Sequence, residues 1–147
     1  MRIAKIRKVK TPTRGTKGSA GIDFYVPDNY PADIGPIDPG HAVFVPSGIS
    51  AKVPDGYALI AFNKSGVALK KGLTVGACVV DSDYQGEIHL HLVNTSTKPV
   101  HIEPGEKLVQ FLLLPVDHCD IEVVDRDTLF QSESQRGSGG FGSTGVK

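Results

Sequence analysis

The sequence predicts an all-β fold, a jelly-roll-like barrel or sandwich with one short helix and a flexible glycine-rich tail. Ten prolines and seventeen glycines divide the chain into short segments. Most of these segments are apolar or alternating, are rich in β-branched and aromatic residues, and are too short for helices. Only SGVALKKG (65–72) has the character of a helical turn or two, opened by a serine and closed by a glycine.

The expected elements follow one another as short strands. The N-terminal run IAKIRKV (3–9) spaces its apolar residues by three, so its pattern matches a strand only in part. The remaining candidates share an apolar or alternating pattern: AVFV (42–45), YALIAF (57–62), ACVV (77–80), EIHLHLV (87–93), KLVQFLLL (107–114) and IEVV (121–124). We expect residues 1–135 to form the β domain and residues 136–147 to form a mobile arm.

Length and composition indicate one globular domain. The chain has 147 residues, of which 39% are hydrophobic and 22% charged. Sixteen basic and sixteen acidic residues cancel, which argues against stable nucleic-acid binding. The basic residues that precede the first acid, Asp23, form either a phosphate-binding patch or, as we favour, a solvated edge strand.

The cysteines and the absence of long apolar runs bear on location. Cys78 and Cys119 have no C-x-x-C spacing, so free thiols are expected. No apolar leader segment follows the N-terminal charges, and no run approaches the ~20 apolar residues of a membrane span. We therefore expect a cytoplasmic protein that does not bind membranes.

The stretch CVVDSDYQGEIHLHLV (78–93) is the first candidate for chemistry. An apolar strand ends at Asp81, a tight turn follows, and an alternating strand resumes at Glu87, which predicts a β-hairpin with Tyr84 at its tip. Asp81 is then a candidate functional carboxylate at a strand end. The alternative is that Asp81 and Asp83 only hydrogen-bond the turn backbone.

A second candidate is NKSGVA (63–68), where a strand leads into the predicted helix. A cation at Lys64, a hydroxyl at Ser65 and a helix N-terminus together suit an anion. The alternative is an N-cap serine beside a surface lysine. No histidine lies near Ser65 in the sequence, so a covalent serine mechanism has no support.

A third candidate is a transition-metal site. Glu87, His89 and His91 fall on one face of a strand at period two. A further ligand would be needed, with His41, His101 or His118 as candidates. Histidines on a strand face are more often solvated or buried at a subunit contact, and we favour that interpretation.

The tail RGSGGFGSTG (136–145) fits two phosphate-binding templates in part. Its glycines satisfy the pattern G-x-G-x-x-G. The segment also matches the P-loop pattern at every position except the lysine. Both templates require a helix after the glycines, and only two residues follow Gly145. Neither template therefore applies literally.

Five stretches in order resemble the motifs of the trimeric dUTPases, the deoxyuridine triphosphatases: AGIDFY (20–25), NKSGVA (63–68), GACVVDSDYQGEI (76–88), PGEKLVQ (104–110) and RGSGGFGSTG (136–145). The resemblance runs from Ala20 to Gly145. It implies a Mg²⁺-dependent enzyme that hydrolyses dUTP to dUMP and pyrophosphate by attack of water at the α-phosphorus. Such an enzyme keeps uracil out of DNA and supplies dUMP for thymidylate synthesis.

The resemblance also implies roles for individual residues. Asp81 would hold and polarise the attacking water, with Asp23 and Gln110 supporting the phosphates and the metal-bound water. Mg²⁺ would sit on the substrate phosphates and waters rather than on a protein ligand. The expected substrate-binding residues are Lys64, Ser65, Gly66, Cys78, Val79, Val80, Tyr84, Arg136, Phe141, Gly142 and Ser143.

Within that set, the resemblance implies that backbone groups near Cys78, Val79 and Val80 read the uracil edge. Tyr84 would pack under the deoxyribose and Phe141 would stack on the base. Lys64 stands where the family usually has arginine, and Cys78 where glycine is common. The implied assembly is a homotrimer in which three chains build each site.

Two relatives of this function remain as alternatives. The dCTP deaminases share the fold, but their deaminating glutamate motif is not evident here. A non-catalytic nucleotide-binding protein would keep the pocket while losing Asp81 or the tail, and this sequence has both.

Overall fold

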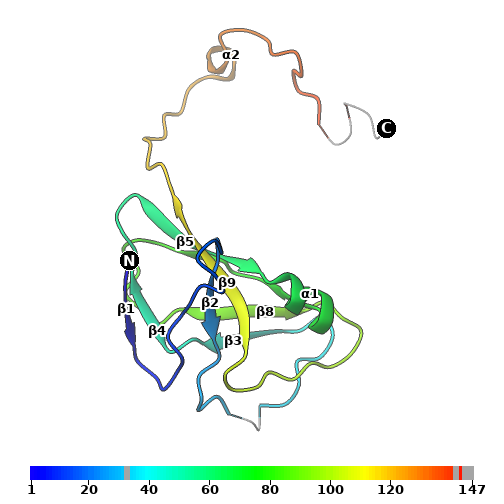
Figure 1. The fold of residues 1–147 in the computed structure, drawn as a ribbon. Coiled ribbons are helices and arrows are strands. Elements are labelled where there is room, and N and C mark those ends of the chain that lie inside the picture. Colours follow the sequence, from blue (N-terminus) through cyan, green and yellow to red (C-terminus); the bar gives the residue numbers. More distant parts are fainter. Residues whose placement is uncertain (32–33, 141–142, 144–147) are drawn as a thin grey trace. The chain divides into compact units, whose positions relative to one another are not determined.

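The computed structural model describes residues 1–31, 34–140 and 143, and nearly all its regular elements are strands (Figure 1). The elements in chain order are β1 (Arg2–Lys5), β2 (Ile22–Tyr25), β3 (Ala42–Pro46), β4 (Ile49–Lys52), β5 (Tyr57–Asn63), α1 (Ser65–Lys71), β6 (Leu73–Val75), β7 (Val79–Val80), β8 (His89–Asn94), β9 (Lys107–Pro115) and α2 (Arg126–Leu129). The predicted all-β class is confirmed, and the predicted helix corresponds to α1.

The chain divides into two compact units, Met1–Asp117 and His118–Lys147. The first unit holds all the strands of the described residues, and the second holds α2, a single turn that the sequence pattern did not predict. No helix in the described part of the chain is long and apolar enough to span a membrane.

The strands form three antiparallel sheets with the orders β1-β4, β2-β9-β5-β7 and β3-β8-β6. In the four-stranded sheet, β9 pairs with β2 on one side and β5 on the other. Gln110 of β9 is in register with Asp23 of β2 and with Phe62 of β5. This register brings residues from three of the predicted motifs to one part of the sheet.

Alternation of side chains gives the sheets one continuous core. In β8, Leu90, Leu92 and Asn94 are buried while His89 is exposed, as the period-two pattern predicts. Phe24 of β2 and Phe111 of β9 are fully buried with ring centroids 4.5 Å apart, a tilted aromatic pair typical of cores.

The predicted hairpin over residues 78–93 is wrong in its pairing. β7 pairs with β5, whereas β8 pairs with β3 and β6. The hairpin strands are therefore β6 and β8, and residues 76–88 are their connection. The prediction failed because it paired neighbours in sequence, while β7 finds its partner in a different sheet.

The strand expected over residues 121–124 is also absent. Ile121 and Val123 are 92% and 93% exposed, and neither belongs to a strand. High β-propensity does not make a strand without a partner and a surface to cover. In contrast, the first part of the N-terminal run does form a strand, β1, because β4 offers it an antiparallel partner.

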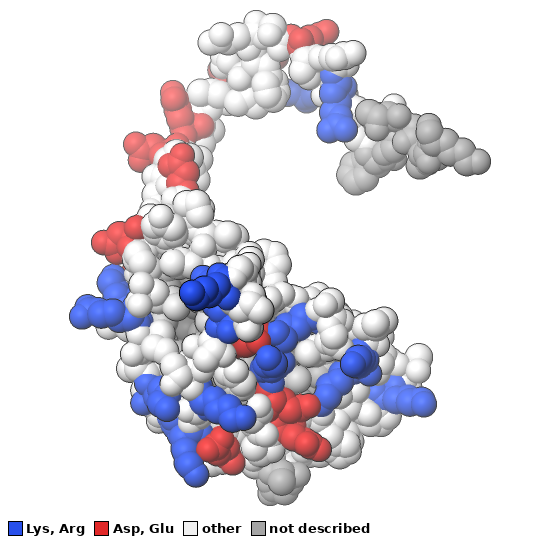
Figure 2. All heavy atoms as spheres, in the orientation of Figure 1, with Lys and Arg blue, Asp and Glu red and all other residues white. Residues whose placement is uncertain are grey.

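The residues of β1 are exposed and the strand pairs only with β4, as expected for a solvated edge strand at the basic N-terminus. Basic and acidic side chains are interspersed on the face of the first unit that Figure 2 shows. Lys8 lies 3.7 Å from Asp28, and Arg7 makes a two-point ion pair with Glu87, with Nε–Oε1 and Nη2–Oε2 distances of 2.7 and 2.9 Å. These pairs tie the basic segment to the fold.

The Arg7–Glu87 pair also fixes a tight turn. Glu87 Oε1 accepts the backbone N–H of Gly48 at 2.8 Å. Gly48 has φ of 71°, and a Cβ there would lie 2.9 Å from the Cβ of Arg7, so only glycine fits. The hydrogen bonds from Arg7 hold the pKa of Glu87 below its usual value.

We expect Glu87→Gln to lower the melting temperature at pH 7 by about 2–4 °C, because it removes the charge from this pair but keeps its shape. Because the pKa of Glu87 is lowered in the folded state, the stabilisation is fully present above the pKa of the unfolded chain, about 4.3. It is lost as the pH falls through the pKa of the folded state. The difference between the two proteins should therefore be smaller at pH 4 than at pH 7 and shrink further as the pH falls. Asp55→Asn, in an exposed pair with Lys52, is the control with little effect. A constant difference at both pH values would contradict the account.

Candidate active site

A pocket of about 180 Å³ lies beside residues 77–81, where the chain runs from β6 through β7 into the turn. Its other lining residues include Phe44, Tyr84, Ile88 and Phe111. The peptide groups of this stretch are therefore beside a small, partly apolar cavity. Such a cavity suits a flat ring whose polar edge meets backbone donors and acceptors.

Asp81 follows β7 directly, lines this pocket and is exposed. Its carbonyl accepts the backbone N–H of Tyr84 at 3.3 Å, which closes the turn. Within the described residues, neither the Asp81 nor the Asp83 carboxylate is hydrogen-bonded to the turn backbone. The alternative interpretation of these carboxylates as turn-capping groups is therefore not supported.

Tyr84 folds back over its own turn. Its hydroxyl donates to the Glu87 carbonyl at 2.9 Å, and a Cβ at Gly86 would lie 2.5 Å from that hydroxyl oxygen. Glycine at position 86 is therefore needed for the ring to adopt this position. The ring remains 45% exposed, so one side of it is available to a ligand.

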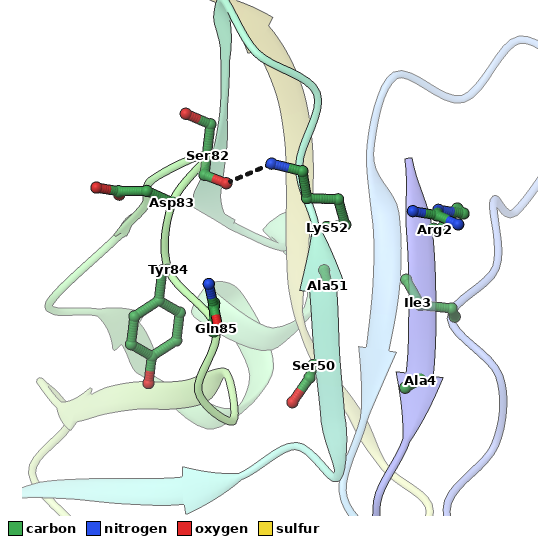
Figure 3. A pocket seen from close by; sticks show the side chains of 10 residues that line it. All are labelled: Arg2, Ile3, Ala4, Ser50, Ala51, Lys52, Ser82, Asp83, Tyr84 and Gln85. Carbon is green, nitrogen blue, oxygen red and sulfur yellow. Dashed lines mark hydrogen bonds between the residues drawn. The ribbon is translucent and has the colours of Figure 1, made fainter.

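A larger pocket of about 530 Å³ lies between the turn and the two-stranded sheet (Figure 3). There Ser82–Gln85 face Ser50–Lys52 of β4, and Lys52 Nζ donates to the Ser82 carbonyl at 3.4 Å. Neither Asp81 nor the peptide groups of 77–80 line this pocket. We therefore place the candidate chemistry in the smaller pocket and assign the larger one no role.

A second group of site residues surrounds Asp23, whose side chain is buried in β2. Asp23 forms ion pairs with Lys64 and, at 3.1 Å, with Lys107. These two cations satisfy a carboxylate that would otherwise be costly to bury. Arginine is usual at this position in the family that the sequence resembles, but the lysine at position 64 still reaches Asp23.

Lys107 is a residue that the sequence analysis missed. The hydrogen bond from its ammonium to Asp23 raises the pKa of Lys107 above its ordinary value. Lys107 lies on β9, and its contact with Asp23 exists because β9 pairs with β2 through a register shift between Phe24 and Tyr25. No local sequence signal reports that pairing.

Gln110 lies at the centre of this second group. Its Nε2 donates to the Asn63 carbonyl at 2.8 Å, next to Lys64. A Cβ on Gly21 would lie 2.2 Å from Gln110 Oε1, so the first motif leaves space for this amide. The sequence motifs at 20–25, 63–68 and 104–110 therefore lie together in the fold.

Ser65 begins α1, and Lys64 occupies the N-cap position without a side-chain capping bond. The alternative of an N-cap serine is therefore wrong, since Ser65 lies one residue inside the helix. Ser65 and Gly66 are both exposed at the end of β5, beside the Asp23 group. Their polar groups are available to a ligand.

The two groups do not form one pocket within a chain. Asp23, Lys64, Ser65 and Gln110 are not among the residues that line the pocket beside Asp81. Of the tail residues, Arg136 and Ser143 are exposed, and Gly137 has φ of 53°. Phe141 and Gly142 lie outside the described residues.

The structure does not favour the metal-site alternative at β8. Among the described residues, no three His, Cys, Asp or Glu side chains are grouped to hold a metal ion. His89 Nδ1 lies 3.0 Å from the Glu87 carbonyl, and His91 Nδ1 accepts a backbone N–H. The two imidazoles are thus engaged with the backbone.

Comparison with known proteins gives consistent matches. A family model described as dUTPase matches residues 7–145. The deoxyuridine 5'-triphosphate nucleotidohydrolase of Hydrogenobaculum sp. (strain Y04AAS1) is 40% identical over 148 residues, covering 99% of this chain and 97% of the relative.

Solved structures agree in fold. The dUTPase of Staphylococcus bacteriophage 80alpha with dUPNHPP has a TM-score of 0.82 at 21% identity, covering 99% of this chain and 98% of that one. A mutant dUTPase from phage phi11 of S. aureus, described with a structural Mg(II) ion, has a TM-score of 0.73 at 17% identity, covering 85% of this chain and 96% of that one. At these identities the likeness concerns the fold alone.

We expect Asp23→Asn to destabilise the protein by about 2 kcal/mol, because charge-assisted hydrogen bonds of this kind contribute about 1.5–3 kcal/mol. The substitution also leaves Lys64 and Lys107 close together without the carboxylate that both of them contact. Urea unfolding at neutral pH measures the change. Asp28→Asn, in a longer and more exposed pair with Lys8, is the matched control and should cost far less. If Asp23→Asn lowers the free energy of unfolding no more than Asp28→Asn does, the Asp23 ion pairs are not stabilising.

Proposed function

Because the chain belongs to the dUTPase family, we propose that its hydrolysis of dUTP to dUMP proceeds by attack of water on the α-phosphorus, with Asp81 as general base and pyrophosphate as leaving group. The observation that carries this proposal is the position of Asp81. It is an exposed carboxylate at the end of β7, on the edge of the pocket formed by residues 77–81. A base bound there would direct its 5'-phosphates toward the carboxylate.

In this proposal the pocket selects uracil by its peptide groups and its size. Backbone donors and acceptors around Cys78, Val79 and Val80 pair with the polar edge of the base. A small pocket excludes the 5-methyl of thymine, and cytosine would leave polar groups unpaired. Tyr84, held by its hydrogen bond to the Glu87 carbonyl, would pack against the deoxyribose and leave no space for a 2'-hydroxyl.

The Asp23 group is the proposed binding site for the phosphates. Lys64 brings positive charge, and Ser65 and Gly66 offer a hydroxyl and a backbone N–H. Gln110 would orient water through its amide. The Asp23 carboxylate, engaged by Lys64 and Lys107, would hold these cations in place rather than touch the phosphates.

Mg²⁺ is proposed as the cofactor, held by the substrate. Asp23 fits a supporting role better than a ligand role, because both its oxygens already pair with lysines. Mg²⁺ retains water and commonly binds through substrate phosphates, where it would neutralise charge on the leaving pyrophosphate. The chain's own residues would orient the triphosphate, while Asp81 takes the proton of the attacking water.

We further propose a homotrimer with sites built by three chains. The pocket beside Asp81 lacks the phosphate-binding residues of its own chain, so a second chain would provide them. The exposed apolar side chains of the second unit, Ile121, Val123, Leu129 and Phe130, suit contacts between chains. Three-fold symmetry would make three equivalent sites. The free thiols of Cys78 and Cys119 suit a reducing, cytoplasmic setting.

Residues 136–147 are proposed as the arm that closes each site. Arg136 would add charge against the phosphates, Phe141 would stack on the base, and Gly142 and Ser143 would offer backbone and hydroxyl groups. Ordering a glycine-rich segment costs about 1–2 kcal/mol per residue, so the arm would order only when the nucleotide supplies contacts.

We expect Asp81→Asn to lower turnover of dUTP by about 10²–10⁴, since it keeps the shape of the side chain but removes the base. Asp83→Asn, in the same turn, should be much milder. Pyrophosphate release measures both, and the wild-type protein should process dTTP, dCTP and UTP at least ~100-fold less well than dUTP. Release of orthophosphate would refute attack at the α-phosphorus, and equal losses in the two variants would refute the role of Asp81.

Ending the chain after Gln135 should leave the fold and the oligomeric state intact while reducing turnover severely, because the proposed arm excludes water and completes the site. Circular dichroism and light scattering check the fold and assembly, and pyrophosphate release checks turnover. Phe141→Ala should show a smaller loss. An active truncated protein would exclude the arm from catalysis.

A further inference from the structure

His91 contacts the backbone at the point where the chain leaves β6 for the pocket. Its ring Nδ1 accepts the N–H of Ala77 at 2.6 Å, and its own carbonyl accepts the N–H of Gly76 at 2.9 Å. One residue of β8 thus holds two successive peptide groups. These peptides lead directly into residues 77–81, which line the pocket beside Asp81.

Neighbouring residues restrict the ring of His91 on two sides. A Cβ at Gly76 would lie 2.3 Å from Nδ1, so the absence of a side chain there allows the ring to approach. On the other side, the ring stacks on Phe44 of β3 with centroids 4.1 Å apart and planes at 8°. Phe44 is paired in register with His91 and is 60% exposed, and both residues line the pocket.

We propose that His91 is a positioning residue for base recognition, acting through the peptide group of Ala77. The imidazole, stacked on Phe44, holds residues 76–78 so that the following peptide groups face the base. This inference rests on the proposed assignment of residues 77–80 to uracil binding. Ordering a loop before the ligand arrives improves affinity, because the ligand no longer bears that entropic cost.

The acceptor role requires one protonation state. A neutral histidine that accepts at Nδ1 carries its proton on Nε2. Protonation adds a hydrogen to Nδ1, which then opposes the Ala77 N–H, and the bond is lost. The titratable side chains that line the same pocket are Cys78, Asp81, Tyr84, Glu87 and His89, and β3 contributes only Phe44 from its side.

The test compares His91→Phe, which keeps a stacking ring without an acceptor, with His91→Asn, whose side-chain oxygen can replace Nδ1. We measure kcat and KM for dUTP by pyrophosphate release at pH 7.5. His91→Phe should raise KM about 10-fold, as expected for one lost hydrogen bond, with kcat within about 2-fold of wild type. His91→Asn should stay within about 3-fold of the wild-type KM.

His91→Asn separates positioning from packing, because it removes the ring but keeps an acceptor oxygen. If His91→Phe fails to fold, as judged by circular dichroism, His91→Ala takes its place as the variant without an acceptor, and an unchanged KM there overturns the role of His91.

A further variant distinguishes failure of this inference from failure of the assigned site. Val79→Arg introduces a large side chain into the pocket and should raise KM strongly if residues 77–80 bind the base. A raised KM in Val79→Arg together with an unchanged KM in His91→Phe overturns the role of His91 alone. An unchanged KM in Val79→Arg overturns the uracil assignment and the inference with it.

Discussion

The pairing of β9 with both β2 and β5 is the constraint on which the site depends. It puts Gln110 in register with Asp23 on one side and Phe62 on the other, so motifs far apart in sequence meet in one sheet. The same pairing brings Lys107 and Lys64 to opposite oxygens of the buried Asp23 carboxylate. A one-residue slip of β9 would turn its side chains to the other face and disperse the group.

The connection between β6 and β8 is built in a different way. Its backbone is held by contacts with residues outside it: β7 pairs with β5, Arg7 and Gly48 hold Glu87, and His91 holds Ala77. An exposed stretch is thereby given a defined backbone before any nucleotide binds. The groups proposed for base recognition and for phosphate binding are thus each preorganised, but they do not line one pocket of a single chain.

Local sequence patterns predicted the all-β class and the helix after β5, whereas the roles of most candidate site residues came from the family resemblance. They failed wherever the partner was distant. The hairpin assignment put β7 beside β8, and residues 121–124 have β-propensity but no partner strand. The role of Lys107 depends on the pairing of β2 with β9. His91 was considered as a metal ligand or as a solvated or interface residue, and its contact with the backbone of Ala77 was missed, although the glycine at position 76 that accommodates its ring is visible in the sequence.

The most direct test of the account is complementation between two inactive chains, Asp81→Asn and Gln110→Ala. If each site takes its hairpin loop and its phosphate-binding group from different chains, an equal mixture of co-refolded subunits regains activity. Random assembly would leave about a quarter of the sites with both groups intact. Recovery toward that fraction, in oligomers shown by mass spectrometry to be mixed, is the predicted result. Activity no higher than that of the separate variants would show that each chain holds a complete site.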